Sequence, residues 1–119
     1  MSLIAELKAL GADTDEGLDR VMGDESLYEM MLGMFVDAIQ SSAITPQDFD
    51  GGDLEGLTKK VHTLKGTTGN LSLTPLFNGY NTALGLLRDG QPAKAKDEYM
   101  RLLPVQDKML ACIKGHQGT

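Results

Sequence analysis

The chain has 119 residues, of which 41% are apolar, and a formal net charge of −6. This length supports one domain with one hydrophobic core, and the longest unbroken apolar run, residues 109–113, is far too short to span a membrane. The single cysteine, Cys112, excludes an internal disulfide and a multi-cysteine metal site, the negative charge argues against nonspecific nucleic-acid binding, and no glycine-rich phosphate loop for ATP is present. Because the N-terminus also lacks the pattern of a secretory signal, we expect one domain over residues 1–119 in the reducing cytoplasm.

The charges are distributed unevenly along the chain. Residues 1–57 contain 13 acids and two bases, a net charge of −11, whereas residues 58–119 contain nine bases and four acids, a net charge of +5. Two interpretations stay open. Acidic and basic helices lie side by side within one fold, or a basic face meets an anionic partner.

The first half of the chain carries two helix-start signals. Asp13 followed by Glu16 resembles a capping box and predicts a short helix over residues 14–22. Asp24 predicts the start of a second helix that runs to about residue 42. The apolar stripe of this helix is expected to contain Leu27, Met30, Met31, Met34, Phe35 and Ala38. The seven methionines of the chain are expected mostly to fill the core.

The second half predicts three more helices. After a connection at residues 45–52, a third helix is expected from Asp53 to about Asn70. Thr74 as a cap and Pro75 in the first turn begin a fourth helix, which ends near residues 89–90. Its apolar stripe is expected to contain Leu76, Phe77, Tyr80, Ala83, Leu84 and Leu87. The last helix starts near residue 92 and contains Pro104, which predicts a kink or a break.

No segment shows the alternation typical of a strand, so the predicted fold class is all-α. Four amphipathic helices joined by short loops predict an antiparallel up-down-up-down four-helix bundle with a core over about residues 10–114. The segment near residues 3–10 and the short helix after it are expected to pack across one end, and residues 115–119 to form a loose tail. We expect a monomer, because no large apolar stripe is left over.

One histidine of the third helix is predicted to face solvent. On a helical wheel, His62 lies roughly 130° from the centre of the apolar stripe of that helix. Thr58, Lys65, Gly66 and Gly69 share its exposed stripe. Lys59 and Lys60 add positive charge nearby, and no acid lies between residues 55 and 89.

The composition of this stripe is unusual for a helix. Each glycine in a helix costs about 1 kcal/mol relative to alanine, and Gly66 and Gly69 are expected to point away from the core. Two interpretations stay open. The glycines relax the end of the helix, which suits Gly69 near the terminus better than Gly66, or they leave space for a partner's surface close to the imidazole of His62. Lys65, one turn away, disfavours a second positive charge on the imidazole and offers hydrogen bonds to a phosphoryl group. With no second histidine, serine or cysteine coupled to it, His62 is the best candidate nucleophile.

Residues 61–71, VHTLKGTTGNL, resemble the signature of the histidine-containing phosphotransfer (HPt) domains of bacterial two-component phosphorelays. In that family the pattern is roughly A/V-H-x-L-K-G-x-x-x-x-L-G on the second helix of a four-helix bundle. Residues 13–36 also resemble the segment that precedes this helix, and the resemblance covers about residues 10–114. One departure is Ser72, where the family usually has glycine. Serine can also begin the next helix, so we expect no effect on activity.

The resemblance implies a role for each residue of the stripe. His62 accepts and donates a phosphoryl group, Lys65 steadies the phosphoryl oxygens, and Gly66 and Gly69 leave room for the incoming receiver domain. Apart from the resemblance, we also expect Thr58 and Lys59 to bind the partner. The implied partners are response-regulator receiver domains and a hybrid sensor histidine kinase. The implied protein is a phosphoryl carrier rather than an enzyme, with no cofactor or metal of its own because magnesium belongs to the receiver.

Three alternatives stay open. The first is a helical docking module that carries no phosphate. The second is a metal- or cofactor-binding bundle with inward-facing ligands, and the third is a phosphoacceptor domain cut from a larger hybrid kinase. The N-terminal methionine and the short tail favour a stand-alone protein over the last of these.

Overall fold

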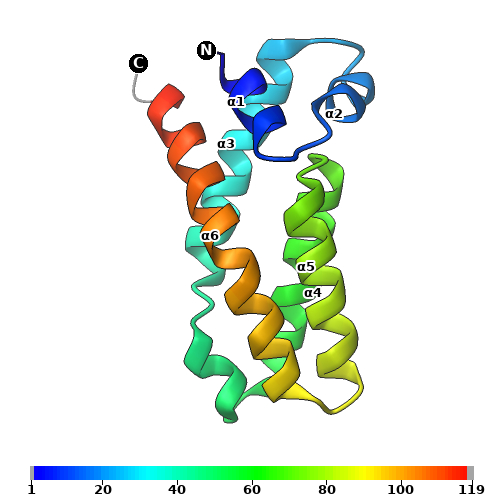
Figure 1. Cartoon of the computed structure of the whole chain (residues 1–119), viewed down its shortest axis with the longest axis vertical. Helices are drawn as coiled ribbons and strands as arrows, with labels where there is room; N and C mark the ends of the chain where they lie inside the picture. The colour runs from blue at the N-terminus through cyan, green and yellow to red at the C-terminus, as the bar shows by residue number, and fades with distance from the viewer. Residues whose placement is uncertain (1, 118–119) are drawn as a thin grey trace.

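All regular structure in residues 2–117, the part of the chain that the computed structural model describes, is helical (Figure 1). The elements in chain order are α1 (Leu3–Ala9), α2 (Thr14–Arg20), α3 (Glu25–Ser42), the 3-10 helix η1 (Pro46–Asp50), α4 (Leu54–Asn70), α5 (Thr74–Arg88) and α6 (Pro92–Gln117). The predicted all-α class is therefore confirmed, and none of these helices has both the length and the hydropathy needed to cross a bilayer.

Aspartate side chains cap the first turns of three helices. The carboxylates of Asp13 and Asp24 each accept a backbone N–H at 3.1 Å, and that of Asp53 accepts one at 2.8 Å. An N-cap carboxylate satisfies an amide that has no partner within its own helix, and it interacts favourably with the positive end of the helix dipole. The predicted starts of α2, α3 and α4 are confirmed.

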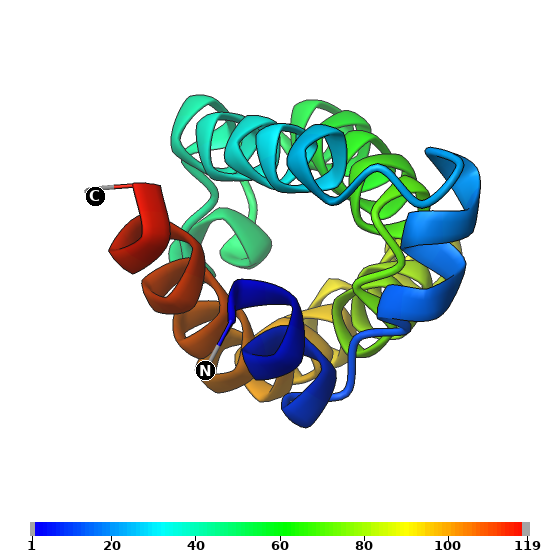
Figure 2. The ribbon, with the colours of Figure 1, turned by 90° about the horizontal axis from the view of Figure 1, so that it is seen from above.

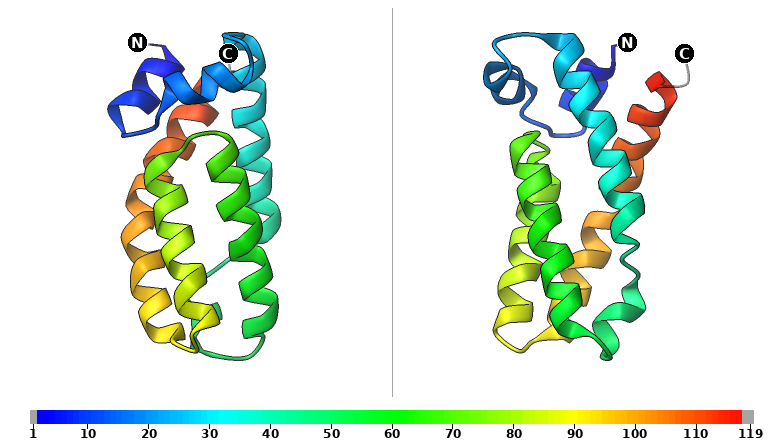
Figure 3. Two further views of the ribbon diagram at one scale, coloured as in Figure 1. Left: turned by 90° about the vertical axis from the view of Figure 1, so that its right-hand side faces the viewer. Right: turned by 180° about the vertical axis from the view of Figure 1, so that it is seen from behind.

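The long helices pack side by side around one core. α4 contacts α5, α5 contacts α6, and α3 contacts both α4 and α6 (Figures 2 and 3). The short helices α1 and α2 lie at one end of this bundle (Figure 1). Leu3 and Leu7 are buried in the core, on the helix that contacts α6. The core thus begins earlier than the predicted residue 10, because these two leucines lie one turn apart on the same face of α1.

The methionine prediction is wrong for most of the described methionines. Met22 and Met30 are 97% and 62% exposed, and Met34 and Met100 are 63% and 47% exposed, whereas only Met109 is fully buried. The buried stripe of α3 contains Tyr28, Leu32, Gly33, Phe35 and Val36. Met30 and Met34 lie on the opposite side of the helix, because the stripe centres on the large aromatic side chains rather than on the methionines.

α6 continues through Pro104 as one helix, so no break occurs there. Pro104 lies on an exposed position, where water can satisfy the carbonyl that loses its amide partner. The helix also extends over residues 115–117, the first three of the expected loose tail, and residues 118–119 lie outside the described part.

Three buried tyrosines predict alkaline unfolding. Burial raises the pKa of Tyr28 and of Tyr99 to about 12, and it also raises the pKa of Tyr80. Since an unfolded tyrosine ionises near pH 10, the stability that the neutral phenols contribute is complete below pH ~10 and is lost as the pH rises towards ~12. We expect phenolate absorbance and loss of helical circular dichroism to appear together in that range. Tyrosines that ionise near pH 10 while the helices persist would contradict this prediction.

Candidate functional site

The buried face of α4 and the cap at its N-terminal end determine the orientation of this helix. Leu57, Val61, Leu64 and Thr68 are buried, and Asp53 caps the start of the helix. Because the apolar stripe points into the bundle, the side chain of His62 is exposed on the opposite face, as its position on the helical wheel predicts.

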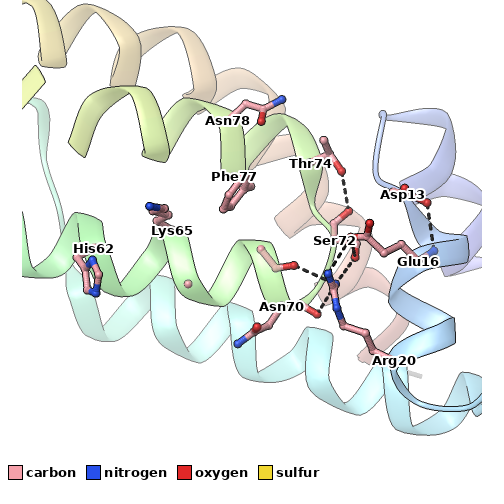
Figure 4. Close-up of a pocket in the computed structure, with 12 residues that line it drawn as sticks. Asp13, Glu16, Arg20, His62, Lys65, Asn70, Ser72, Thr74, Phe77 and Asn78 are labelled. Atoms are coloured by element: carbon pink, nitrogen blue, oxygen red, sulfur yellow. Dashed lines mark hydrogen bonds and ion pairs between the residues drawn. The ribbon is translucent and has the colours of Figure 1, made fainter. Parts of the chain in front are cut away.

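A surface groove of about 560 Å³ runs from His62 to the start of α5 (Figure 4). Its lining residues come from α2 and the residue before it, from α4, from the turn after α4, and from the first turns of α5: Asp13, Glu16, Arg20, His62, Lys65, Gly66, Gly69, Asn70, Ser72, Thr74, Phe77 and Asn78. The structure therefore brings four of the predicted residues, His62, Lys65, Gly66 and Gly69, into one groove.

The polar ends of His62 and Lys65 are free within the described residues. Neither side chain makes a hydrogen bond or an ion pair there. A surface imidazole without a partner can act as a nucleophile, and an ammonium one turn away can donate to oxygens placed on the ring. The two side chains together can accept an anionic electrophilic group from a second molecule.

The surroundings of Gly66 and Gly69 differ, and only one of them requires a glycine. A Cβ atom on Gly66 would have no neighbour within 4 Å, so nothing in the fold requires a glycine at this position. A Cβ atom on Gly69 would lie 2.9 Å from the ring of Phe77, which is closer than side chains pack. Both glycines were expected to face away from the rest of the fold, and this is wrong for Gly69, because Phe77 of α5 occupies the space beside it.

Arg20 fixes the C-terminal end of α4. Its Nη1 donates to the carbonyl oxygens of Gly69 and Asn70 at 3.0 and 3.1 Å and to the hydroxyl of Ser72, and its Nη2 donates to Glu16 at 2.9 Å. A cation at this position interacts favourably with the negative end of the helix dipole, although the Gly69 carbonyl also accepts the Ser72 N–H at 3.1 Å. Although Arg20 lines the groove, its guanidinium is engaged by the protein itself.

Ser72 lies in the turn after α4, two residues beyond its end, rather than at the start of α5. Its φ of +57° lies in the left-handed region, where glycine is unstrained and serine is not. The hydroxyl of Ser72 donates to Glu16 at 2.8 Å and accepts from Arg20, so the side chain contributes bonds that a glycine would lack. Likewise Thr74 is the first residue of α5 rather than its cap, because the N-cap is Leu73.

Thr58 and Lys59 do not line the groove. The hydroxyl of Thr58 donates to the Leu54 carbonyl at 2.7 Å, within its own helix. The ammonium of Lys59 lies 3.8 Å from Glu55 in an exposed pair. These residues remain at the N-terminal side of His62, whereas the groove extends towards the C-terminal end of α4.

The groove contains residues that the sequence did not identify as functional. Phe77, predicted for the apolar stripe of α5, lies in the groove, together with Asn70 and Asn78. The sequence contained a signal for the position of Phe77, since Gly69 and Phe77 each lie four residues from Leu73 at the turn between the two helices. Residues equally far from a tight turn between packed helices face each other, so a glycine opposite an aromatic residue indicates close contact.

Within residues 2–117, no three histidine, cysteine or acidic side chains gather so as to hold a metal ion. Comparison of the chain with protein-family models, curated proteins and solved structures found no match.

Proposed function

We propose that this chain is a histidine phosphotransfer protein of a phosphorelay. In this proposal His62 accepts a phosphoryl group from the aspartate of a receiver domain and passes it to the aspartate of another. The observation that carries the proposal is the exposed imidazole of His62, which has no partner among the described residues and lies beside Lys65 and an uncrowded Gly66.

The proposed scaffold is an up-down-up-down bundle of α3, α4, α5 and α6. It is supported by the short connections between α4 and α5 and between α5 and α6, and by the contacts of α3 with α4 and α6. Such a bundle is rigid, so it can hold His62 at a defined distance from a partner that docks on α4.

The transfer is a balanced displacement at phosphorus. A ring nitrogen of neutral His62 attacks the phosphorus of the receiver's aspartyl phosphate, an N–P bond forms, and the bond from phosphorus to the carboxylate oxygen breaks. The electron pair leaves with the carboxylate. Phosphoryl transfer of this kind depends mainly on positioning and charge stabilisation, and the ammonium of Lys65 supplies positive charge next to the equatorial oxygens.

In this proposal the receiver supplies the magnesium site, since the two carboxylates of the groove, Asp13 and Glu16, lie at its α2 end, away from His62 (Figure 4). Neither α4 beyond Glu55 nor α5 carries a carboxylate, so the magnesium ion and its ligands belong to the receiver. The same property disfavours hydrolysis of the phosphohistidine, because no side chain near His62 on these helices can activate water.

The test is phosphoryl transfer from radiolabelled, phosphorylated receiver domains to the purified chain. Under the proposal, the chain gains an acid-labile, alkali-stable label, and the label moves on to a second, unphosphorylated receiver. A chain that binds receivers but gains no label from any of them would instead be a docking module without phosphotransfer.

Replacing Lys65 with alanine is expected to slow transfer about 10- to 100-fold. A hydrogen bond to a charged group contributes about 1.5–3 kcal/mol, and the ammonium of Lys65 has no other partner among the described residues. Single-turnover transfer rates measure the effect. Lys60→Ala, an exposed lysine of the same helix outside the groove, is the control. Equal rates for the two variants would remove Lys65 from the mechanism.

A further inference from the structure

Phe77 is an aromatic side chain without a place in the core. Phe35 and Phe49 are fully buried, at 0% and 2% exposure, but Phe77 is only partly buried. It is also absent from the partly buried hydrophobic residues that pack against the core cluster. Its ring lies in the groove instead, where α5 faces α4 (Figure 4).

The ring of Phe77 has a rigid support. Because Gly69 has no side chain, the ring lies directly on the backbone of α4. One turn closer to His62, Gly66 leaves the surface of α4 bare. His62, Gly66 and Gly69 follow one another at intervals of four and three residues, so a bare strip leads along α4 from the imidazole to the aromatic ring.

The ring of Phe77 lies too far from His62 to contact the transferred phosphoryl group. Seven residues along a helix correspond to about 10 Å, so the ring lies well beyond the reach of a phosphoryl group on His62 and well within the footprint of a docked domain. A contact at this distance changes how tightly a partner docks and leaves the transfer step itself unchanged.

The His62 end of the groove has the charge of a docking surface for an acidic partner, whereas the acidic side chains of the groove, Asp13 and Glu16, lie at its α2 end (Figure 4). Lys65 presents a cation with no partner among the described residues, whereas Arg20 is occupied by Glu16 and the end of α4. The exposed amides of Asn70 and Asn78 border the ring without adding charge. Aromatic side chains on rigid supports, surrounded by polar residues, are the typical anchors of protein interfaces.

We propose that Phe77 is the contact that selects the receiver domain, by seating an apolar side chain that borders the receiver's acidic phosphorylation pocket. This inference rests on the proposed function, because the receiver must place its aspartyl phosphate at His62 while the apolar side chain lies on Phe77. Receivers with a polar or charged side chain at that position would dock poorly.

The experiment compares two phosphoryl donors. Phosphoramidate is small and needs no docking; its P–N bond breaks, ammonia leaves, and the new N–P bond forms on His62. A phosphorylated receiver that labels the wild-type chain is the second donor. For Phe77→Ala we expect the KM for this receiver to rise about tenfold, with kcat and phosphoramidate labelling unchanged, and for Phe77→Leu we expect most of the affinity to return.

A second variant keeps the test decisive if Phe77→Ala is poorly folded. Asn78→Trp fills the groove at an exposed position, and Asn81→Trp adds the same bulk on the same helix outside the groove. We expect only Asn78→Trp to raise the KM. Wild-type KM values for Phe77→Ala and Asn78→Trp, or a parallel loss of phosphoramidate labelling, would overturn the inference. Absence of labelling of the wild-type chain by both donors would instead overturn the proposed function.

Discussion

His62→Gln is expected to abolish phosphoryl acceptance completely while the protein remains folded. Glutamine keeps a polar side chain of similar length but has no nucleophilic ring nitrogen. The His62 side chain is exposed and makes no hydrogen bond within the described residues, so the free energy of unfolding should change by less than about 0.5 kcal/mol. Label transfer from a phosphorylated receiver measures the first expectation, and urea unfolding measures the second.

His116→Gln is the matched control for this variant, since the chain has only two histidines. His116 lies on α6, where its Nε2 is 3.0 Å from a carboxylate oxygen of Glu6 on α1. This variant should accept the phosphoryl group at the wild-type rate. Acid-labile label on His62→Gln, or its loss from His116→Gln, would mean that the acceptor has been misassigned.

Gly66→Leu is expected to stabilise the protein and to slow receiver-dependent transfer on the order of 100-fold. The stability gain is about 1 kcal/mol, because leucine favours a helix interior more than glycine does and a Cβ atom at this position meets nothing within 4 Å. The loss of transfer follows from the bare strip beside His62, since a displacement of the docked partner by about 1 Å can cost that much. Thermal unfolding and single-turnover transfer measure the two effects.

Gly85→Leu separates the two effects of this substitution. Gly85 is an exposed glycine inside α5, also has open space around it, and does not line the groove. It should give a similar gain in stability with wild-type transfer. Wild-type transfer in both variants would show that the bare surface at Gly66 has no role in docking. Gly69 is less suitable for this comparison, because a side chain there would displace Phe77.

Local signals predicted the parts of the fold that depend on one helix at a time. Asp13, Asp24 and Asp53 cap the helices that they were expected to begin, because an N-cap bond joins residues only three apart. The exposure of His62 is of the same kind. Its position relative to the apolar stripe of α4 decides which way it points, whichever helices cover that stripe.

Features that depend on contact with a second helix could not be predicted from the sequence in this way. Met30 and Met34 have the spacing of a core stripe, but the position of the neighbouring helices decides which side of α3 is covered. The serine at position 72 was expected to begin a helix. Its hydroxyl instead meets Arg20 and Glu16, which precede it by more than 50 residues.

The amino-acid sequence by itself determined that the chain is helical, where most of its helices begin, and that an imidazole, an ammonium group and a glycine share one outward face of α4. Only the tertiary structure decided that this face continues into a groove bordered by α2 and α5, that Gly69 accommodates Phe77, and that Thr58 and Lys59 lie outside the groove. The reason is physical. Helical periodicity is a property of residues a few positions apart, whereas the shape of a groove depends on which distant side chains meet when the helices pack.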